Sequence, residues 1–221
     1  MPLLSPDDQQ TLRGMFADMT VPVTLLFVTQ SFGCETCDDT KRILSELREL
    51  TDKIAVEEVN LVLDKDRAAG LGIDRAPGIA VLADGKDTRI RFLGAPAGYD
   101  FMALVDSILA VSGASDMALS EDSLALVADV ATPINIQVFV TPTCVYCPRA
   151  VALAVRMAAA NPNITATTVQ ATEFFDLARQ FRVTGVPKTV VNGDIEILGA
   201  QPEPVFVRTV LGLDVPDDSD V

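Results

Sequence analysis

The pattern Cys-x-x-Cys occurs twice among the 221 residues of the chain, as CETC at residues 34–37 and as CVYC at residues 144–147. These motifs hold all four of its cysteines. A thiolate attacks a disulfide, and a second thiol close by can then resolve the mixed disulfide and release the partner. We therefore expect thiol–disulfide chemistry at two catalytic sites. The expected nucleophiles are Cys34 and Cys144, and the expected resolving thiols are Cys37 and Cys147.

A proline follows each motif at the same distance, 43 residues after its first cysteine, and the two motifs are offset by 110 residues. These prolines are Pro77 and Pro187. The match indicates one unit used twice, and the chain is long enough for two domains of about 110 residues. We place the domains at 1–114 and 115–214, with an acidic tail at 215–221.

The composition limits the class of partner. The net charge is −14, from 17 basic and 31 acidic residues, and both halves are acidic. No basic stripe is available to neutralise phosphates, so we expect no nucleic-acid partner. The chain has no histidine, which excludes Ser-His-Asp triads, Cys-His nucleophile pairs and histidine-containing zinc sites.

The N-terminal sequence lacks the basic start and long apolar core of a signal peptide, and no apolar run is long enough to span a bilayer. We therefore expect a cytoplasmic protein with no membrane partner. In the cytoplasm structural disulfides are rare, and Cys-x-x-Cys is more often redox-active or metal-binding.

The two halves show the same predicted order of elements: helix, strand, helix, strand, short helix, two-strand hairpin and closing helix. Each motif directly follows an apolar, β-branched run, at 23–29 and 134–140, that is typical of a buried strand. An apolar helical stripe follows each motif with the same offset. Its members are Ile43, Leu44, Leu47, Leu50, Leu153, Ala154, Met157 and Ala160. The expected hairpins pair 79–82 with 89–93 and 189–191 with 195–198, through Asp84-Gly85 and Asn192-Gly193.

This order, with a dithiol between a strand and a helix and a proline before the hairpin, resembles the thioredoxin fold. Two such units in one chain resemble the protein disulfide oxidoreductases of the glutaredoxin-like family. The resemblance covers nearly the whole chain. It implies an α/β fold of two tandem thioredoxin-like domains, each with a central mixed β-sheet flanked by helices. It also implies an enzyme that reduces, forms or isomerises protein disulfides and needs no cofactor beyond its redox-active disulfides.

The resemblance further implies cis peptide bonds at Ala76-Pro77 and Val186-Pro187, each beside a dithiol. The backbone groups of Ala76 and Val186 would then be free to pair with a substrate backbone. Around the motifs we expect Phe32 and Tyr146 to form an apolar rim that receives a partner, Phe139 to be core and Lys188 to be a surface lysine. The implied partners are proteins with disulfides or thiols, and a thioredoxin-reductase-like flavoprotein as electron donor.

The charges around the two motifs differ. Glu35, Asp38 and Asp39 lie at the first motif, whereas Arg149 lies at the second. Negative charges raise the pKa of a thiol, so we expect Cys144 to have the lower pKa and the second site to carry most of the turnover. If these side chains point into solvent, they contribute little. Val28 and Val138 occupy the place of the buried acid of thioredoxins, so no internal carboxylate base is expected there.

Two alternative functions remain open at this stage. A glutaredoxin-like electron carrier to a peroxidase, as in the front end of alkyl hydroperoxide reductase, would use the same chemistry, but that module usually lacks one of the two dithiols. A structural protein could instead hold zinc through four cysteine thiolates. Zinc pairs usually sit on glycine-bearing knuckles rather than between a buried strand and a long helix.

Overall fold

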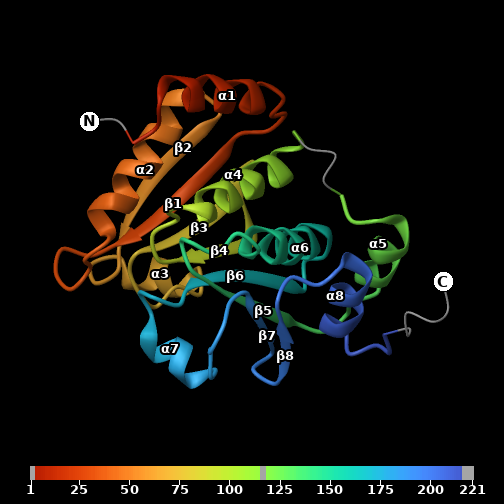
Figure 1. Ribbon diagram of the computed structural model, residues 1–221. Helices are drawn as coiled ribbons and strands as arrows, with labels where there is room; N and C mark the ends of the chain where they lie inside the picture. The colour runs from red at the N-terminus through yellow and green to blue at the C-terminus, as the bar shows by residue number, and fades with distance from the viewer. Residues whose placement is uncertain (1–2, 115–117, 216–221) are drawn as a thin grey trace.

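A computed structural model describes residues 3–114 and 118–215, and there the strands form one eight-stranded sheet (Figure 1). The strand order across the sheet is β2-β1-β3-β4-β6-β5-β7-β8. The first unit contains α1 (Pro6–Ala17), β1 (Val23–Thr29), α2 (Cys37–Leu50), β2 (Ile54–Asn60), α3 (Lys65–Gly70), β3 (Gly78–Ala83), β4 (Lys86–Leu93) and α4 (Tyr99–Ser112). The second contains α5 (Glu121–Ala128), β5 (Ile134–Val140), α6 (Cys147–Ala160), β6 (Ile164–Gln170), α7 (Phe175–Gln180), β7 (Lys188–Val191), β8 (Ile195–Leu198) and α8 (Glu203–Val210).

Local sequence accounts for where several of these elements begin and turn. Ser5 caps α1 in a capping box with Asp8, and Ser120 caps α5 by accepting a hydrogen bond from the backbone of Ser123. Both hairpins turn through residues with positive φ, Asp84 with Gly85 and Asn192 with Gly193. The first turn has two residues between β3 and β4 and requires this backbone conformation, whereas the second also includes Asp194 before β8 begins.

The side chains of the sheet alternate between two apolar clusters, as the pleat of a strand requires. In β1, Leu25 and Phe27 belong to a cluster with residues of α1, α2, α4, α5, α6 and α8. Leu26 and Val28 belong to a second cluster with residues of α3 and α7. Each cluster contains side chains of both units, so the hydrophobic packing on each face of the sheet continues from one unit to the other.

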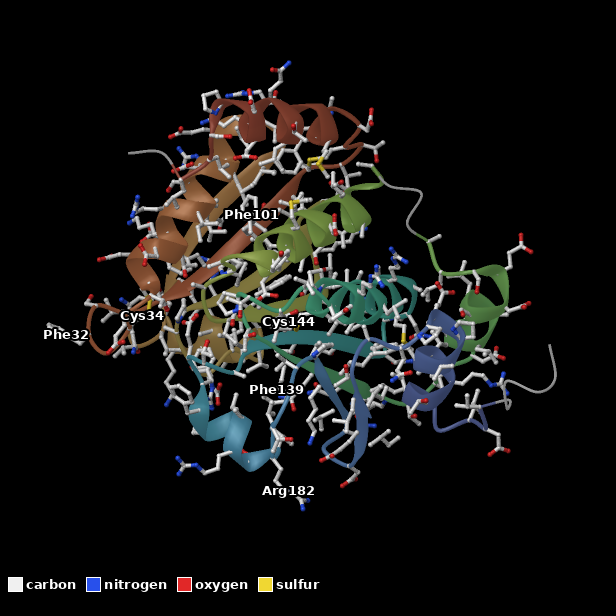
Figure 2. The ribbon with its side chains drawn as sticks, in the orientation of Figure 1. Phe32, Cys34, Phe101, Phe139, Cys144 and Arg182 are labelled. Carbon is white, nitrogen blue, oxygen red and sulfur yellow. A yellow bond between two sulfur atoms is a disulfide. The ribbon has the colours of Figure 1, made fainter. Side chains whose placement is uncertain are left out.

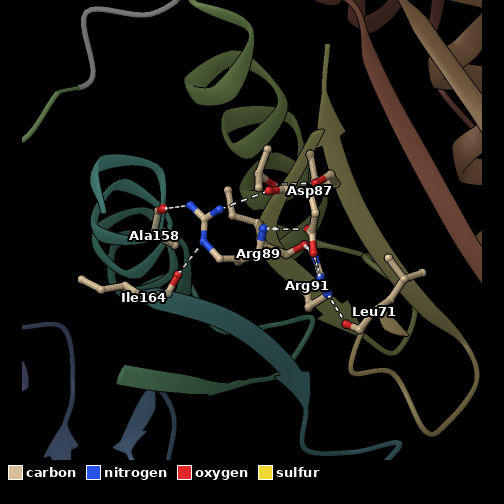
Figure 3. A network of polar contacts seen from close by, with 9 residues as sticks. Leu71, Asp87, Arg89, Arg91, Ala158 and Ile164 are labelled. Atoms are coloured by element: carbon tan, nitrogen blue, oxygen red, sulfur yellow. Dashed lines mark hydrogen bonds and ion pairs between the residues drawn. The ribbon is translucent and has the colours of Figure 1, made fainter. Parts of the chain in front are cut away.

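The two units join through β4 and β6, which pair in parallel from Ile90 with Ala166 to Leu93 with Val169. Arg89 precedes this ladder at a β-bulge, with a φ of 63°. Its guanidinium crosses to the second unit and donates hydrogen bonds to the carbonyls of Ala158 (2.7 Å) and Ile164 (3.2 Å) (Figure 3). The first unit's hairpin is therefore tied to the end of α6 and the start of β6.

The structure confirms the expected α/β fold with two thioredoxin-like units and differs from the sequence expectations in detail. β4 begins at Lys86 rather than at residue 89, because it continues through the bulge and pairs again near the turn. Ala160 is exposed at the last position of α6, so its expected place in the apolar stripe is wrong. Residue 115, where the second domain is expected to begin, and residues 216–221 of the expected acidic tail lie outside the described residues. Within those residues no helix is both long and apolar enough to cross a membrane.

Candidate active sites at two strand-to-helix turns

The first dithiol is closed as a disulfide between Cys34 and Cys37, with the Cα atoms 5.5 Å apart. Cys34 lies in the loop after β1 and is half-buried, whereas Cys37 is buried as the first residue of α2. The N-terminus of a helix carries a partial positive charge, which favours a thiolate over a thiol. The more accessible Cys34 is therefore placed to meet a partner, and Cys37 lies behind it.

The second dithiol repeats this arrangement at the start of α6, with Cys144 and Cys147 joined and their Cα atoms 5.4 Å apart. Cys147 is fully buried and Cys144 nearly so. The backbone N–H of Cys147 donates a hydrogen bond to Sγ of Cys144 over 3.1 Å. A donor aimed at this sulfur favours its charged form when the disulfide is opened.

The bonds Ala76-Pro77 and Val186-Pro187 are both cis, as the family resemblance implied. The carbonyl of Pro77 accepts a hydrogen bond from Gly94, and that of Pro187 accepts one from Gly199, each over 2.9 Å. Cys34, Ala76 and Val186 are all partly buried and pack against the same apolar cluster. Among the described residues, the backbone N–H groups of Ala76 and Val186 donate to no other group of the chain.

Two of the three aromatic residues singled out by the sequence are exposed, and the third is buried as expected. Phe32 is 90% exposed in the loop before Cys34 (Figure 2). Tyr146 is 60% exposed within the second motif. Phe139 is fully buried in β5, with its ring 5.6 Å from the ring of Phe181. The exposed rings lie next to the dithiols, whereas Phe139 supports the sheet.

Lys188 corrects one expectation, because it is 3% exposed and no surface lysine. Its Nζ donates to the carbonyl of Phe181 and pairs with the carboxylate of Glu196, each over 2.8 Å. The hydrogen bond from Lys188 holds the pKa of Glu196 below its ordinary value. A buried ammonium needs such partners, so Lys188 fastens β7 to β8 and to the end of α7.

The charges that the sequence places at the motifs lie in solvent. Glu35, Asp38, Asp39 and Arg149 are all exposed, and Asp39 lies 3.4 Å from Arg42. Charges in this position are screened by water and salt. Their effect on the two thiols is therefore expected to be small.

A carboxylate from the second unit contacts the first motif instead. Glu173, just before α7, accepts a hydrogen bond from the hydroxyl of Thr36, which lies between Cys34 and Cys37. Its other oxygen accepts one from the backbone N–H of Ala95 over 2.8 Å. Glu173 lies 137 residues from Thr36 in sequence, and no local pattern in the sequence signals the contact.

Asp100 is a second acid that the sequence did not indicate. It lies in the first turn of α4 and is 1% exposed. Burial raises its pKa to about 7, although the amide of Gln170 donates to its carboxyl group. The same amide donates to the carbonyl of Ala95 over 3.3 Å. Asp100 therefore lies at the junction of the two units, in a helix whose N-terminus contacts the loop of the second dithiol through Tyr99 and Pro142.

The described residues contain no group of three or more cysteine, aspartate, glutamate or histidine side chains that could hold a metal ion. Both cysteine pairs are disulfides. Two thioredoxin-fold units, each with a disulfide at the start of a helix, define a thiol–disulfide oxidoreductase.

Comparisons with known proteins agree with this class. A family model described as a thioredoxin domain matches residues 134–212. A protein disulfide oxidoreductase from Aeropyrum pernix K1 is 30% identical, with 96% of each chain covered and a TM-score of 0.86. The chain belongs to this family of protein disulfide oxidoreductases.

The chain is also similar to parts of larger proteins. The NTD_N/C domain of alkylhydroperoxide reductase AhpF from Enterococcus faecalis is 26% identical, with 96% of this chain and 100% of that chain covered and a TM-score of 0.86. An alkyl hydroperoxide reductase protein of Staphylococcus epidermidis is 27% identical over 86% of this chain and 34% of its own length. The chain thus spans about a third of the length of the curated relatives it matches.

Proposed function

We propose that both dithiols exchange electrons with protein disulfides, with Cys34 and Cys144 as nucleophiles and Cys37 and Cys147 as resolving thiols. The observation that carries this proposal is the geometry of the two disulfides. Each lies at a helix N-terminus, with the first cysteine more accessible than the second. A macromolecular partner can approach the more accessible sulfur, and the helix favours its thiolate.

In the reducing direction, the thiolate of the first cysteine attacks one sulfur of a substrate disulfide. A mixed disulfide forms and one substrate thiolate leaves. The second cysteine loses its proton and attacks the sulfur of the first, which closes the disulfide of the enzyme and releases the second substrate thiolate. Two electrons pass to the substrate, and the reverse sequence forms a substrate disulfide.

The substrate backbone would bind beside the two prolines. The free N–H groups of Ala76 and Val186 suit pairing with an extended segment, while Pro77 and Pro187 set the position of those residues. Tyr146 and Phe32 would supply apolar contact at the rim. Backbone pairing of this kind tolerates many substrate sequences.

Substitution of single cysteines tests the assignment. We expect Cys34→Ser and Cys144→Ser each to abolish exchange at its own site, with Cys144→Ser losing more of the insulin-reducing activity. The rate of insulin precipitation in dithiothreitol measures this, and trapping of a mixed disulfide by Cys37→Ser or Cys147→Ser identifies the attacking thiol. Labelling of Cys37 or Cys147 in preference to its partner by iodoacetamide at mildly acidic pH would contradict the roles.

A second candidate function is electron transfer from a flavoprotein to a peroxidase in the cytoplasm. The similarity to the N-terminal region of AhpF over 96% of this chain supports it. The test is to add the chain to a thioredoxin reductase with NADPH, then a peroxidase in its disulfide form and an alkyl hydroperoxide. Peroxide-dependent NADPH oxidation that needs the chain would favour the carrier function. Insulin reduction by the chain, with no peroxide-dependent NADPH oxidation, would favour the general oxidoreductase.

We also propose that 1–114 and 115–214 are the two domains. The repeat of elements supports two units, and the β4–β6 ladder with the shared core supports their folding onto one another. Limited proteolysis near residue 115 would test the boundary by whether the two fragments remain associated.

A further inference from the structure

The two units are arranged head to tail, so their dithiols have different surroundings. The last strand of the first unit, β4, meets the second unit along β6, whereas the matching strand β8 is an edge of the sheet within the described residues. Leu93 at the end of β4 is 8% exposed, and its counterpart Leu198 is 64% exposed. The turn after β6 therefore lies against the first site, and the second site has no neighbouring unit on its corresponding side.

Glu173 is the part of this turn that reaches the motif. Its two oxygens accept hydrogen bonds from Thr36 and Ala95, which hold the carboxylate between the first dithiol and the end of β4. Glu173 and Thr36 are both half-buried. A charge held in this way is screened less than the exposed acids of the motif.

Two effects of this contact act on the sulfur of Cys34 in the same direction. The negative charge opposes the positive end of the α2 helix, which would otherwise favour the thiolate. The hydroxyl of Thr36 donates its hydrogen bond to Glu173, so it has no hydrogen bond to donate to the thiolate. The carbonyl of Thr36 is itself fixed by the N–H and hydroxyl of Thr40 over 2.9 and 2.8 Å.

The other charged groups near the first site do not offset Glu173. Arg75, just before the cis bond, pairs with Asp74 over 3.1 Å and with Asp176 over 2.9 Å, so two carboxylates balance its charge. On the side of α2 the charged neighbours are exposed. They are Glu35, Asp38 and Asp39, with Arg42 lying 3.4 Å from Asp39 and Lys41 paired to Glu58 over 2.7 Å.

We propose that Glu173 is a positioning residue that disfavours the Cys34 thiolate and so makes the first dithiol the stronger reductant of the two. A less stable thiolate destabilises the reduced dithiol relative to its disulfide, which lowers the reduction potential. Electrons would then pass downhill from the first dithiol to the second. This inference rests on the proposed role of Cys34 as the nucleophile.

The test uses the full chain with Cys144→Ser and Cys147→Ser, so that one dithiol titrates. With Glu173→Gln added, we expect the pH midpoint of Cys34 alkylation by iodoacetamide to fall, and the equilibrium with glutathione to shift about threefold toward the reduced dithiol. Glutamine can still accept the hydrogen bond from Ala95, which preserves the turn. Neither measurement needs a partner protein. Both can therefore be interpreted even if the chain does not act on protein disulfides.

Matched variants separate charge from structure. Glu173→Asp keeps the charge and should stay close to the parent, and Glu35→Gln removes an exposed acid of the motif and should change the midpoint less. Thr36→Val, a second route that leaves Glu173 intact, should lower the midpoint by releasing the carboxylate from the motif. An unchanged or raised midpoint in Glu173→Gln, or an equal shift in Glu35→Gln, would overturn the inference. A lower melting temperature with an unchanged midpoint would show a structural role alone.

Discussion

The carboxyl group of Asp100 is buried at the junction of the two units. One oxygen accepts from Gln170, and the other is buried without a hydrogen-bond partner among the described residues. Burial without full compensation favours the neutral acid, which is why the pKa rises from 3.8 to about 7. The protonation state of this group therefore links pH to the stability of the junction.

The direction in which stability changes with pH follows from the pKa of Asp100 in the folded and the unfolded chain. Well below pH 3.8 the carboxyl group is neutral in both the folded and the unfolded chain. Between its unfolded and folded pKa values only the unfolded chain ionises, so stability falls as the pH rises, and above about pH 7 the loss is complete. At about 1.4 kcal/mol per pKa unit, the loss is up to ~4 kcal/mol.

Asp100→Asn removes the ionisation and keeps an acceptor for Gln170. We expect the difference in free energy of unfolding between the variant and the parent to grow in favour of the variant from pH 4.5 to pH 8, by about 3 kcal/mol. Urea unfolding at the two pH values measures this difference. Asp38→Asn, at an exposed position, is the control and should show no such growth; a constant difference for Asp100→Asn would contradict the argument.

At the scale of the element, the N-terminus of helix α4 in the first unit contacts the second unit. Its first residue, Tyr99, donates its N–H to the carbonyl of Pro142 over 2.9 Å, which satisfies one of the free donors of a helix start. Gly98 precedes it with a φ of 60°, and a side chain there would collide with the same carbonyl. A glycine is required at this position by its backbone conformation and by the close approach of the two units.

Gly98→Ala should therefore be costly. We expect a loss of about 1 to 3 kcal/mol from the backbone conformation, because φ 60° with ψ −130° lies outside the left-handed helical region. We expect a further loss from the collision, together with a change in the alkylation rate of Cys144, two residues after Pro142. Gly72→Ala is the matched control, because Gly72 has a φ of 69° and open space around it. Equal losses of stability for the two variants, measured by urea unfolding, would show that the collision is relieved without cost.

At the scale of the whole molecule, local sequence predicts the repeated unit but not how the two units meet. The dithiols, the prolines and the hairpin turns depend on residues close in sequence, and their positions are confirmed. The β4–β6 ladder, the contact of Glu173 with Thr36 and the burial of Lys188 depend on residues brought together by tertiary packing. A lysine in a short apolar strand gives no sign of the carbonyls of Phe181 and Arg182 and the carboxylate of Glu196 that bind it.

The side chain of Arg89 links the two units at their junction. Arg89 donates to the carbonyls of Ala158 and Ile164 from the β-bulge that begins the inter-unit ladder. Arg89→Ala leaves the bulge with its positive φ and removes the donors from both carbonyls, for which we expect a loss of about 2 kcal/mol. For a chain of this length, that corresponds to a fall in melting temperature of about 4 to 8 °C.

Arg67→Ala is the matched control, because Arg67 forms an exposed ion pair with Glu57 within the first unit, and such a pair contributes little. Calorimetry of both variants measures the difference. Since the core and the sheet run through both units, we expect the parent to unfold in one transition and Arg89→Ala to broaden it. Similar melting temperatures for the two variants would show that the strand ladder and the shared core hold the units together without the guanidinium.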